Sequence, residues 1–202
     1  MRQIALAIFL FSTLGCKQLI LLKEGVKQPV LEDHNSLKKF LAKNQIDTTE
    51  ILCFQDTVAL HQFYKTKIGL PDSRFFNRQR ALVDYRESPK DCNGKVSVFL
   101  EKIDSMNLRP PIPGELLHTY LQGVVYEKDL SPFAVTGELY DTYLVIYWAK
   151  YLGKLNKRKV FEWMTLANDA RKRGVKIRVL LINADYQRQW KIKKEDIPYF
   201  KY

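Results

Sequence analysis

The sequence predicts an α/β domain in which a mixed sheet of five strands is flanked by helices, and two observations carry this prediction. An apolar strand, a long amphipathic helix and a second buried strand follow one another between residues 143 and 182. This order is typical of a right-handed crossover between parallel strands. Two short apolar runs at 74–76 and 81–85, separated by four polar residues, predict an antiparallel hairpin.

The first residues have the pattern of a bacterial export signal. A short basic region precedes an apolar run of 11 residues at 4–14, which is too short to span a bilayer as a helix. The run ends in Gly15 and Cys16, and Thr13-Leu14-Gly15-Cys16 resembles a loose lipobox. We expect a lipoprotein signal peptide over residues 1–15 with lipidation of Cys16; an ordinary cleaved signal or an uncleaved anchor extended through residues 19–22 fits the same run.

Residues 16–34 show no periodicity and contain Gly25 and Pro29, which predicts a tether. The remaining chain is long enough for one core, so a single domain is expected over residues 35–202. Its expected helices are a short one capped by Asn35 or Ser36, then 57–67, 96–103, 115–122 and 153–172, and its expected strands are 51–54, the two hairpin strands, 143–148 and 175–182. A proline-rich connection begins at 109–114.

The unit that starts at residue 143 resembles the first half of a thioredoxin-fold protein, whose apolar strand ends in Phe-Trp-Ala-x-Trp before Cys-Gly-Pro-Cys. The matching residues are Tyr147, Trp148, Ala149, Tyr151 and Gly153. Leu152 and Leu155 occupy the positions of the two cysteines, and Lys154 that of the proline. Disulfide exchange needs a thiolate nucleophile and a resolving thiol. The resemblance therefore implies a redox-inactive binding or assembly module with a degenerate redox loop.

The hairpin and its neighbours resemble the second half of a thioredoxin domain, where a cis-proline precedes the first hairpin strand. Pro71 lies at that position. Because this half comes first in the chain, we expect one thioredoxin-like sheet with its elements in permuted order. A small α/β unit followed by a truncated thioredoxin-like unit is the alternative, and the strand order of the sheet distinguishes the two.

Two further cysteines leave a second function open. In an exported chain, Cys53 and Cys92 are compatible with a structural disulfide, and a thiol-disulfide oxidoreductase that uses them is the alternative to a binding module. Cys53 lies in an apolar run and is also compatible with a small buried core residue.

The positive charge of the chain is concentrated in its last quarter. Residues 150–202 contain 15 Lys and Arg against 5 Asp and Glu, whereas residues 16–149 contain 17 of each sign. Lys150, Lys154 and Lys157 surround the degenerate loop and are candidates for anion binding. In a protein of the bacterial cell envelope, lipid-anchored and facing the periplasm or the cell surface, an acidic envelope protein or anionic lipid headgroups are expected partners rather than nucleic acid. A solvated basic face is the simpler interpretation.

Other chemistries have little support in the sequence. The three histidines lack the paired spacing of a zinc site, and neither a Gly-rich phosphate loop nor a Gly-x-Ser-x-Gly elbow is present, so no metal and no cofactor are predicted. Asp185 follows the second buried strand, where α/β sheets place functional loops; capping of the next turn is the alternative role.

Overall fold

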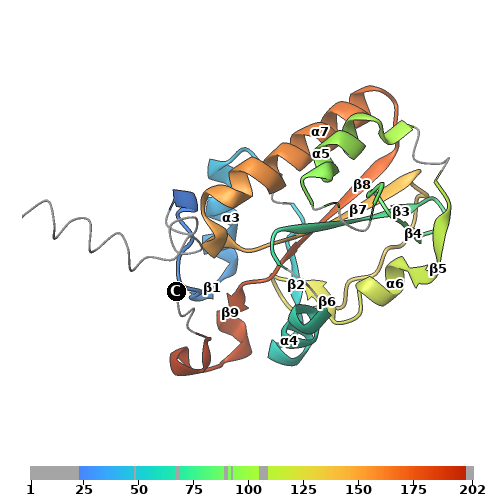
Figure 1. The fold of residues 1–202 in the computed structure, drawn as a ribbon. Helices are drawn as coiled ribbons and strands as arrows, with labels where there is room; N and C mark the ends of the chain where they lie inside the picture. The colour runs from blue at the N-terminus through green and yellow to red at the C-terminus, as the bar shows by residue number, and fades with distance from the viewer. Residues whose placement is uncertain are drawn as a thin grey trace, which may run out of the picture.

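A computed structural model describes residues 23–47, 49–66, 69–88, 91, 93–104 and 109–198. Seven strands form one mixed sheet (Figure 1), in the spatial order β5 (Pro111–Leu116), β4 (Ala81–Val83), β3 (Asp72–Asn77), β7 (Thr142–Trp148), β8 (Ile177–Asn183), β2 (Leu52–Phe54) and β6 (Val124–Tyr126). The helices are α3 (His34–Lys43), α4 (Thr57–Thr66), α5 (Lys95–Glu101), α6 (Leu117–Tyr120) and α7 (Glu162–Lys172). The α/β class and the mixed sheet are those that the sequence predicts.

Strand β7 is the centre of the sheet. It pairs in parallel with β8 along its whole length and antiparallel with β3 on the other side. All its residues are buried, as expected for a continuously apolar strand that is covered on both faces. The hairpin of β3 and β4 and the unit of β7, α7 and β8 therefore contribute to one sheet, although they come from different halves of the chain.

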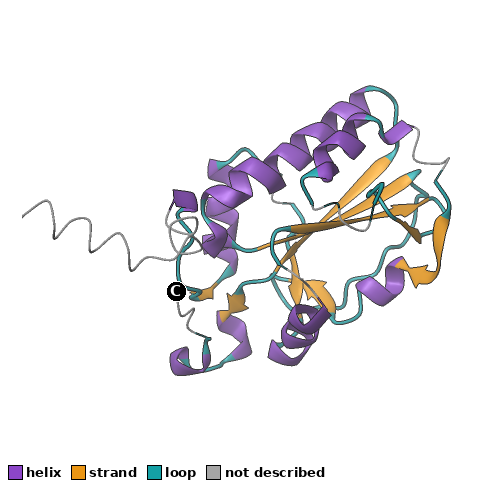
Figure 2. Ribbon diagram, viewed as in Figure 1, coloured by secondary structure: helices purple, strands orange, loops and turns teal. Residues whose placement is uncertain are grey.

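Helices cover both faces of the sheet, and alternate residues of β7 point into the two layers (Figure 2). Leu144, Ile146 and Trp148 belong to the core under α3, α5 and α7. Tyr143, Val145 and Tyr147 belong to the core under α4 and α6. Most of the hydrophobic stabilisation comes from these two layers.

The predicted count of five strands is wrong, because β5 and β6 extend the sheet at its two edges. Strand β5 contains Pro111 and Pro113 and was expected to be a connection; proline has no amide hydrogen to donate, and an edge strand tolerates it. The helix expected over 115–122 is shortened to α6 by that strand. The helix expected from residue 153 begins as a π-helical segment (Asn156–Phe161) and becomes α7 at Glu162.

The N-terminal segment, residues 23–34, packs against the domain although the sequence assigns it to a tether. Its strand β1 (Leu31–Glu32) pairs in parallel with β9 (Tyr186–Gln187). The cap of α3 is Asp33, whose Oδ1 accepts the backbone N–H of Ser36 at 2.9 Å, so the predicted cap at Asn35 or Ser36 is wrong. In the part of the chain that the structure describes, none of the helices has the length and hydrophobicity needed to cross a bilayer.

Candidate functional site

The candidate site is the β7 loop, residues 149–155, which contains the residues that the sequence predicts to form a degenerate redox motif. The chain leaves β7 in a single 3-10 turn (Lys150–Leu152) and reverses at Gly153, whose φ of 58° and ψ of −126° suit glycine far better than an L-residue. The side chain of Asn156 is buried and donates to the carbonyl oxygen of Ala149 at 2.9 Å. The turn into the following helix is therefore fixed by backbone and side-chain contacts.

Apolar packing occupies the positions where a thioredoxin would carry thiols. Leu152 is 6 % exposed, and Leu155 is half-buried. Together with Tyr151 they form a small apolar cluster that also includes Val26 and Leu70. Trp148, immediately before the loop, is fully buried and stacks on Phe40 with ring centroids 5.7 Å apart.

The N-terminal segment lies directly on the β7 loop. The backbone N–H of Lys27 donates to the carbonyl oxygen of Tyr151 at 2.8 Å. A Cβ atom on Gly153 would lie 2.2 Å from the carbonyl oxygen of Gly25, so only glycine permits this approach. Buried Glu24 forms an ion pair with Arg158, on the π-helical segment that follows the loop. Residues 24–27 thus lie against Tyr151 and Gly153 of the β7 loop.

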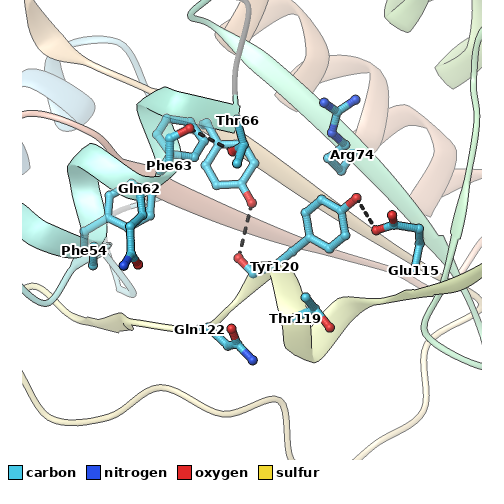
Figure 3. Close-up of a pocket in the computed structure, with 11 residues that line it drawn as sticks. Phe54, Gln62, Phe63, Thr66, Arg74, Glu115, Thr119, Tyr120 and Gln122 are labelled. Atoms are coloured by element: carbon cyan, nitrogen blue, oxygen red, sulfur yellow. Dashed lines mark hydrogen bonds between the residues drawn. The ribbon is translucent and has the colours of Figure 1, made fainter.

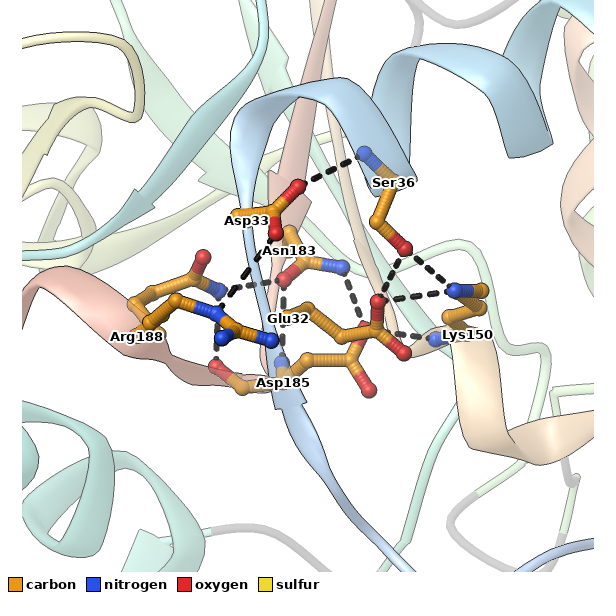
Figure 4. A network of polar contacts seen from close by, with 8 residues as sticks. Glu32, Asp33, Ser36, Lys150, Asn183, Asp185 and Arg188 are labelled. Atoms are coloured by element: carbon orange, nitrogen blue, oxygen red, sulfur yellow. Dashed lines mark hydrogen bonds and ion pairs between the residues drawn. The ribbon is translucent and has the colours of Figure 1, made fainter.

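A polar cluster joins the same segment to the start of the loop (Figure 4). Lys150 Nζ lies 2.7 Å from Glu32 Oε2 and 2.5 Å from Ser36 Oγ, and Ser36 Oγ also donates to Glu32. Glu32 is 5 % exposed. Because a buried carboxylate is stable only when it is paired, the charge of Lys150 is used within the protein. Lys154 and Lys157, by contrast, are exposed.

Asp185 ties the ends of β7 and β8 together. It is 1 % exposed, and its Oδ2 accepts the backbone N–H of Lys150 at 2.6 Å and the amide of Asn183 at 2.7 Å. Burial raises the pKa of Asp185 to about 7; the hydrogen bonds from Lys150 and Asn183 oppose this increase, and the negative charge of Glu32 adds to it. Gln187, on β9, donates to Asn183 Oδ1 at 2.8 Å. The cluster therefore links the loop, the sheet and the pair of β1 and β9.

Of the predicted site residues, the structure brings Lys150, Leu152 and Leu155 together with Asp185 around one loop. The residues that sequence reasoning missed are Glu24, Gly25 and Glu32, which come from a segment without periodicity. The sequence offers one signal for them: Glu24 and Glu32 lie near the two ends of that segment, and either can pair with a cation of the basic last quarter of the chain. Within the described residues, no group of His, Cys, Asp and Glu is arranged to hold a metal ion.

The predicted cysteine sites are only partly described. Cys53 is in β2, is 0 % exposed and forms no disulfide among the described residues. Burial raises the pKa of its thiol, and nearby Glu127 raises it further. Cys16 and Cys92 lie outside the described residues.

Comparisons with protein families, with curated proteins and with solved structures give no significant match to this chain.

Proposed function

We propose that this chain is a redox-inactive, thioredoxin-like binding module that is held at the bacterial cell envelope by a lipidated Cys16. It contacts an anionic partner through two exposed lysines, Lys154 in the β7 loop and Lys157 just after it. The observation that carries the proposal is the state of that loop. Leu152 and Leu155 stand where exchange chemistry would need thiols, and residues 24–27 pack against the same loop. A loop without a thiolate cannot exchange disulfides.

The thioredoxin-like part of the proposal is supported by the arrangement of strands. A parallel unit of β7, α7 and β8 has β3 antiparallel beside β7 and β4 antiparallel beside β3. The peptide bond between Leu70 and Pro71, directly before β3, is cis. The hairpin precedes the parallel unit in the chain yet joins its sheet, as a permuted order of elements would require.

A thiol oxidoreductase that uses Cys53 is less compatible with the structure. A nucleophilic cysteine has to be ionised and accessible. Cys53 lies in β2, between β8 and β6, and is fully buried, and its pKa is raised by that burial. We therefore prefer the binding module.

The exposed charges narrow the predicted anion site. Lys150 is partly exposed and pairs with Glu32, whereas Lys154 in the loop and Lys157 in the π-helical segment after it are exposed. Two cations at the start of a helix favour an anionic surface, and the interaction is screened beyond about 8 Å at physiological ionic strength. Binding is therefore expected to be sensitive to salt.

The binding proposal is tested by co-sedimentation with phosphatidylglycerol and phosphatidylcholine vesicles, and by pull-downs of acidic envelope proteins, at low and high salt. The variant Lys154→Glu/Lys157→Glu should lose binding. The control variant Lys193→Glu/Lys194→Glu changes two exposed lysines elsewhere in the same basic quarter and should keep it. Equal binding by both variants would remove the loop as the contact surface. Separately, Cys16→Ala should abolish lipid labelling, and unchanged labelling would reject the anchor.

A further inference from the structure

A cavity of about 440 Å³ lies on the face of the sheet that α4 and α6 cover (Figure 3). Its volume is within the range of small-molecule sites, about 300–1,000 Å³. It is distinct from the β7 loop, because it faces Tyr147 in the opposite layer from Trp148. It combines one cation, one carboxylate and an aromatic wall, and these three features identify a class of ligand.

The cation is Arg74, in β3. Its neighbour on the same face of the strand, Phe76, is fully buried, whereas the side chain of Arg74 is 26 % exposed and lines the cavity. Arg74 Nη2 lies 3.3 Å from Asp72 Oδ2, which is long for a charged pair, and Nε is buried without a hydrogen-bond partner among the described residues. A buried donor left in this state is costly, and a carboxylate in the cavity would satisfy it.

The carboxylate is Glu115, at the end of β5 (Figure 3). Its Oε2 accepts the hydroxyl of Tyr120 at 2.7 Å, and this contact fixes it at the wall of the cavity. Two carboxylate oxygens can accept several hydrogen bonds, so the Tyr120 contact leaves capacity for an ammonium group. Arg74 and Glu115 lie on the same side of the cavity, with Tyr120 beside them.

The aromatic wall is formed by Phe54, Phe63 and Tyr147. The ring of Phe63 has its centroid 4.9 Å from that of Phe54 and 4.6 Å from that of Tyr147. Rings packed at these distances form a rigid apolar surface that suits an aromatic or branched side chain. In Figure 3 Phe54 and Phe63 lie on the other side of the view from Arg74 and Glu115.

From this combination we infer that the cavity binds a zwitterionic, amino-acid-type ligand with an aromatic or large apolar side chain. Its carboxylate pairs with Arg74, its ammonium group with Glu115, and its side chain packs on Phe63 and Tyr147. This site is independent of the β7 loop and of the proposed envelope partner.

The probe is L-phenylalanine, compared by isothermal titration calorimetry with three molecules that each lack one of its groups. 3-Phenylpropionate lacks the ammonium group, phenethylamine lacks the carboxylate, and glycine lacks the side chain. L-Phenylalanine should bind saturably, and each of the others at least about tenfold more weakly. For the first two the reason is a lost hydrogen bond to a charged group, and for glycine it is the lost burial of an apolar side chain.

The variants assign each contact. Arg74→Met should weaken L-phenylalanine binding at least about tenfold and leave phenethylamine binding unchanged. Glu115→Gln should weaken L-phenylalanine binding by a similar factor and leave 3-phenylpropionate binding unchanged. Thr119→Trp changes an exposed residue at the rim of the cavity, keeps Arg74 and Glu115, and should block entry of the ligand. It keeps the inference testable if the Arg74 variant misfolds. Arg78→Met, outside the cavity, is the control. Absence of saturable L-phenylalanine binding at millimolar concentration, or binding unchanged by Arg74→Met and Thr119→Trp, would overturn the inference.

Discussion

The β7 loop and the Arg74 cavity lie against the same central strand, yet they differ in how their charges are used. In the loop, Lys150 pairs with Glu32, and Asp185 accepts two hydrogen bonds from its neighbours. In the cavity, Arg74 has a long contact with Asp72, and its Nε has no partner among the described residues. The residues that resemble a known motif thus lie in a loop whose buried charges are paired, whereas the ligand site that we infer lies on the face of the sheet that α4 and α6 cover.

Asp185→Asn should have the largest effect, and its sign depends on pH. The folded-state pKa of Asp185 is about 7, against an ordinary value of 3.8, so the folded state retains a proton that the unfolded state releases. Between these values the contribution of Asp185 to stability falls as pH rises. Asn retains the acceptor oxygen without the charge. The variant should therefore gain stability over the wild type from pH 4 to pH 8, by at most about 4 kcal/mol.

Denaturant unfolding of the two proteins across that pH range checks this prediction. Asp196→Asn, at an exposed carboxylate, is the control and should leave the pH dependence unchanged. A stability difference between wild type and Asp185→Asn that does not change with pH would contradict a raised pKa of Asp185 in the folded state.

Gly153→Ala tests the contact between the N-terminal segment and the loop. The new Cβ would meet the carbonyl oxygens of Gly25 and Glu24, and the backbone conformation disfavours any L-residue. We expect a loss of about 3 kcal/mol in the free energy of unfolding, of which the conformational part is about 1–2 kcal/mol. Gly137 also has a positive φ, but a Cβ atom there would meet no described atom within 4 Å, so Gly137→Ala measures the conformational part of the loss alone. Equal losses in the two variants would mean that residues 24–27 do not press on Gly153.

A third prediction compares the two regions directly. Lys150→Met leaves buried Glu32 without its cation and should reduce the free energy of unfolding by about 1–2 kcal/mol, less than for a fully buried pair because Lys150 is partly exposed. Arg74→Met removes a poorly paired cation whose Nε is a buried donor without a partner among the described residues, and it should not lower the free energy of unfolding. Thermal and denaturant unfolding measure both; a larger loss for Arg74→Met would show that Arg74 is structural rather than poised for a ligand.

Local sequence patterns predict the elements that depend on their own residues. The apolar run of β7, the amphipathic α7 and the polar residues between β3 and β4 were enough to place a crossover and a hairpin. Strand β6 is only three residues long, and β5 contains two prolines, so neither has the pattern of an independent strand. Both exist because a neighbouring strand offers hydrogen-bond partners, which a local pattern does not contain.

The candidate sites show the same limit. Leu152 and Leu155 could be placed on one loop, because the motif and the strand before it are contiguous. The packing of residues 24–27 against this loop depends on Gly153 and on the ion pair of Glu24 with Arg158. The partners in these contacts are far apart in the sequence, so no local pattern predicts them. In the sequence, Arg74 looks like an ordinary hairpin residue. The cavity that it lines exists because α4 and α6 pack over the same face of the sheet.

The central claim is that the β7 loop keeps the frame of a redox site without its chemistry. Insulin reduction by the purified protein, with dithiothreitol as the electron source, tests it most directly. The account predicts a rate equal to the background without protein, because Leu152 and Leu155 cannot exchange disulfides and Cys53 is buried with a raised pKa. Turnover above background that Cys53→Ser or Cys92→Ser abolishes would contradict it.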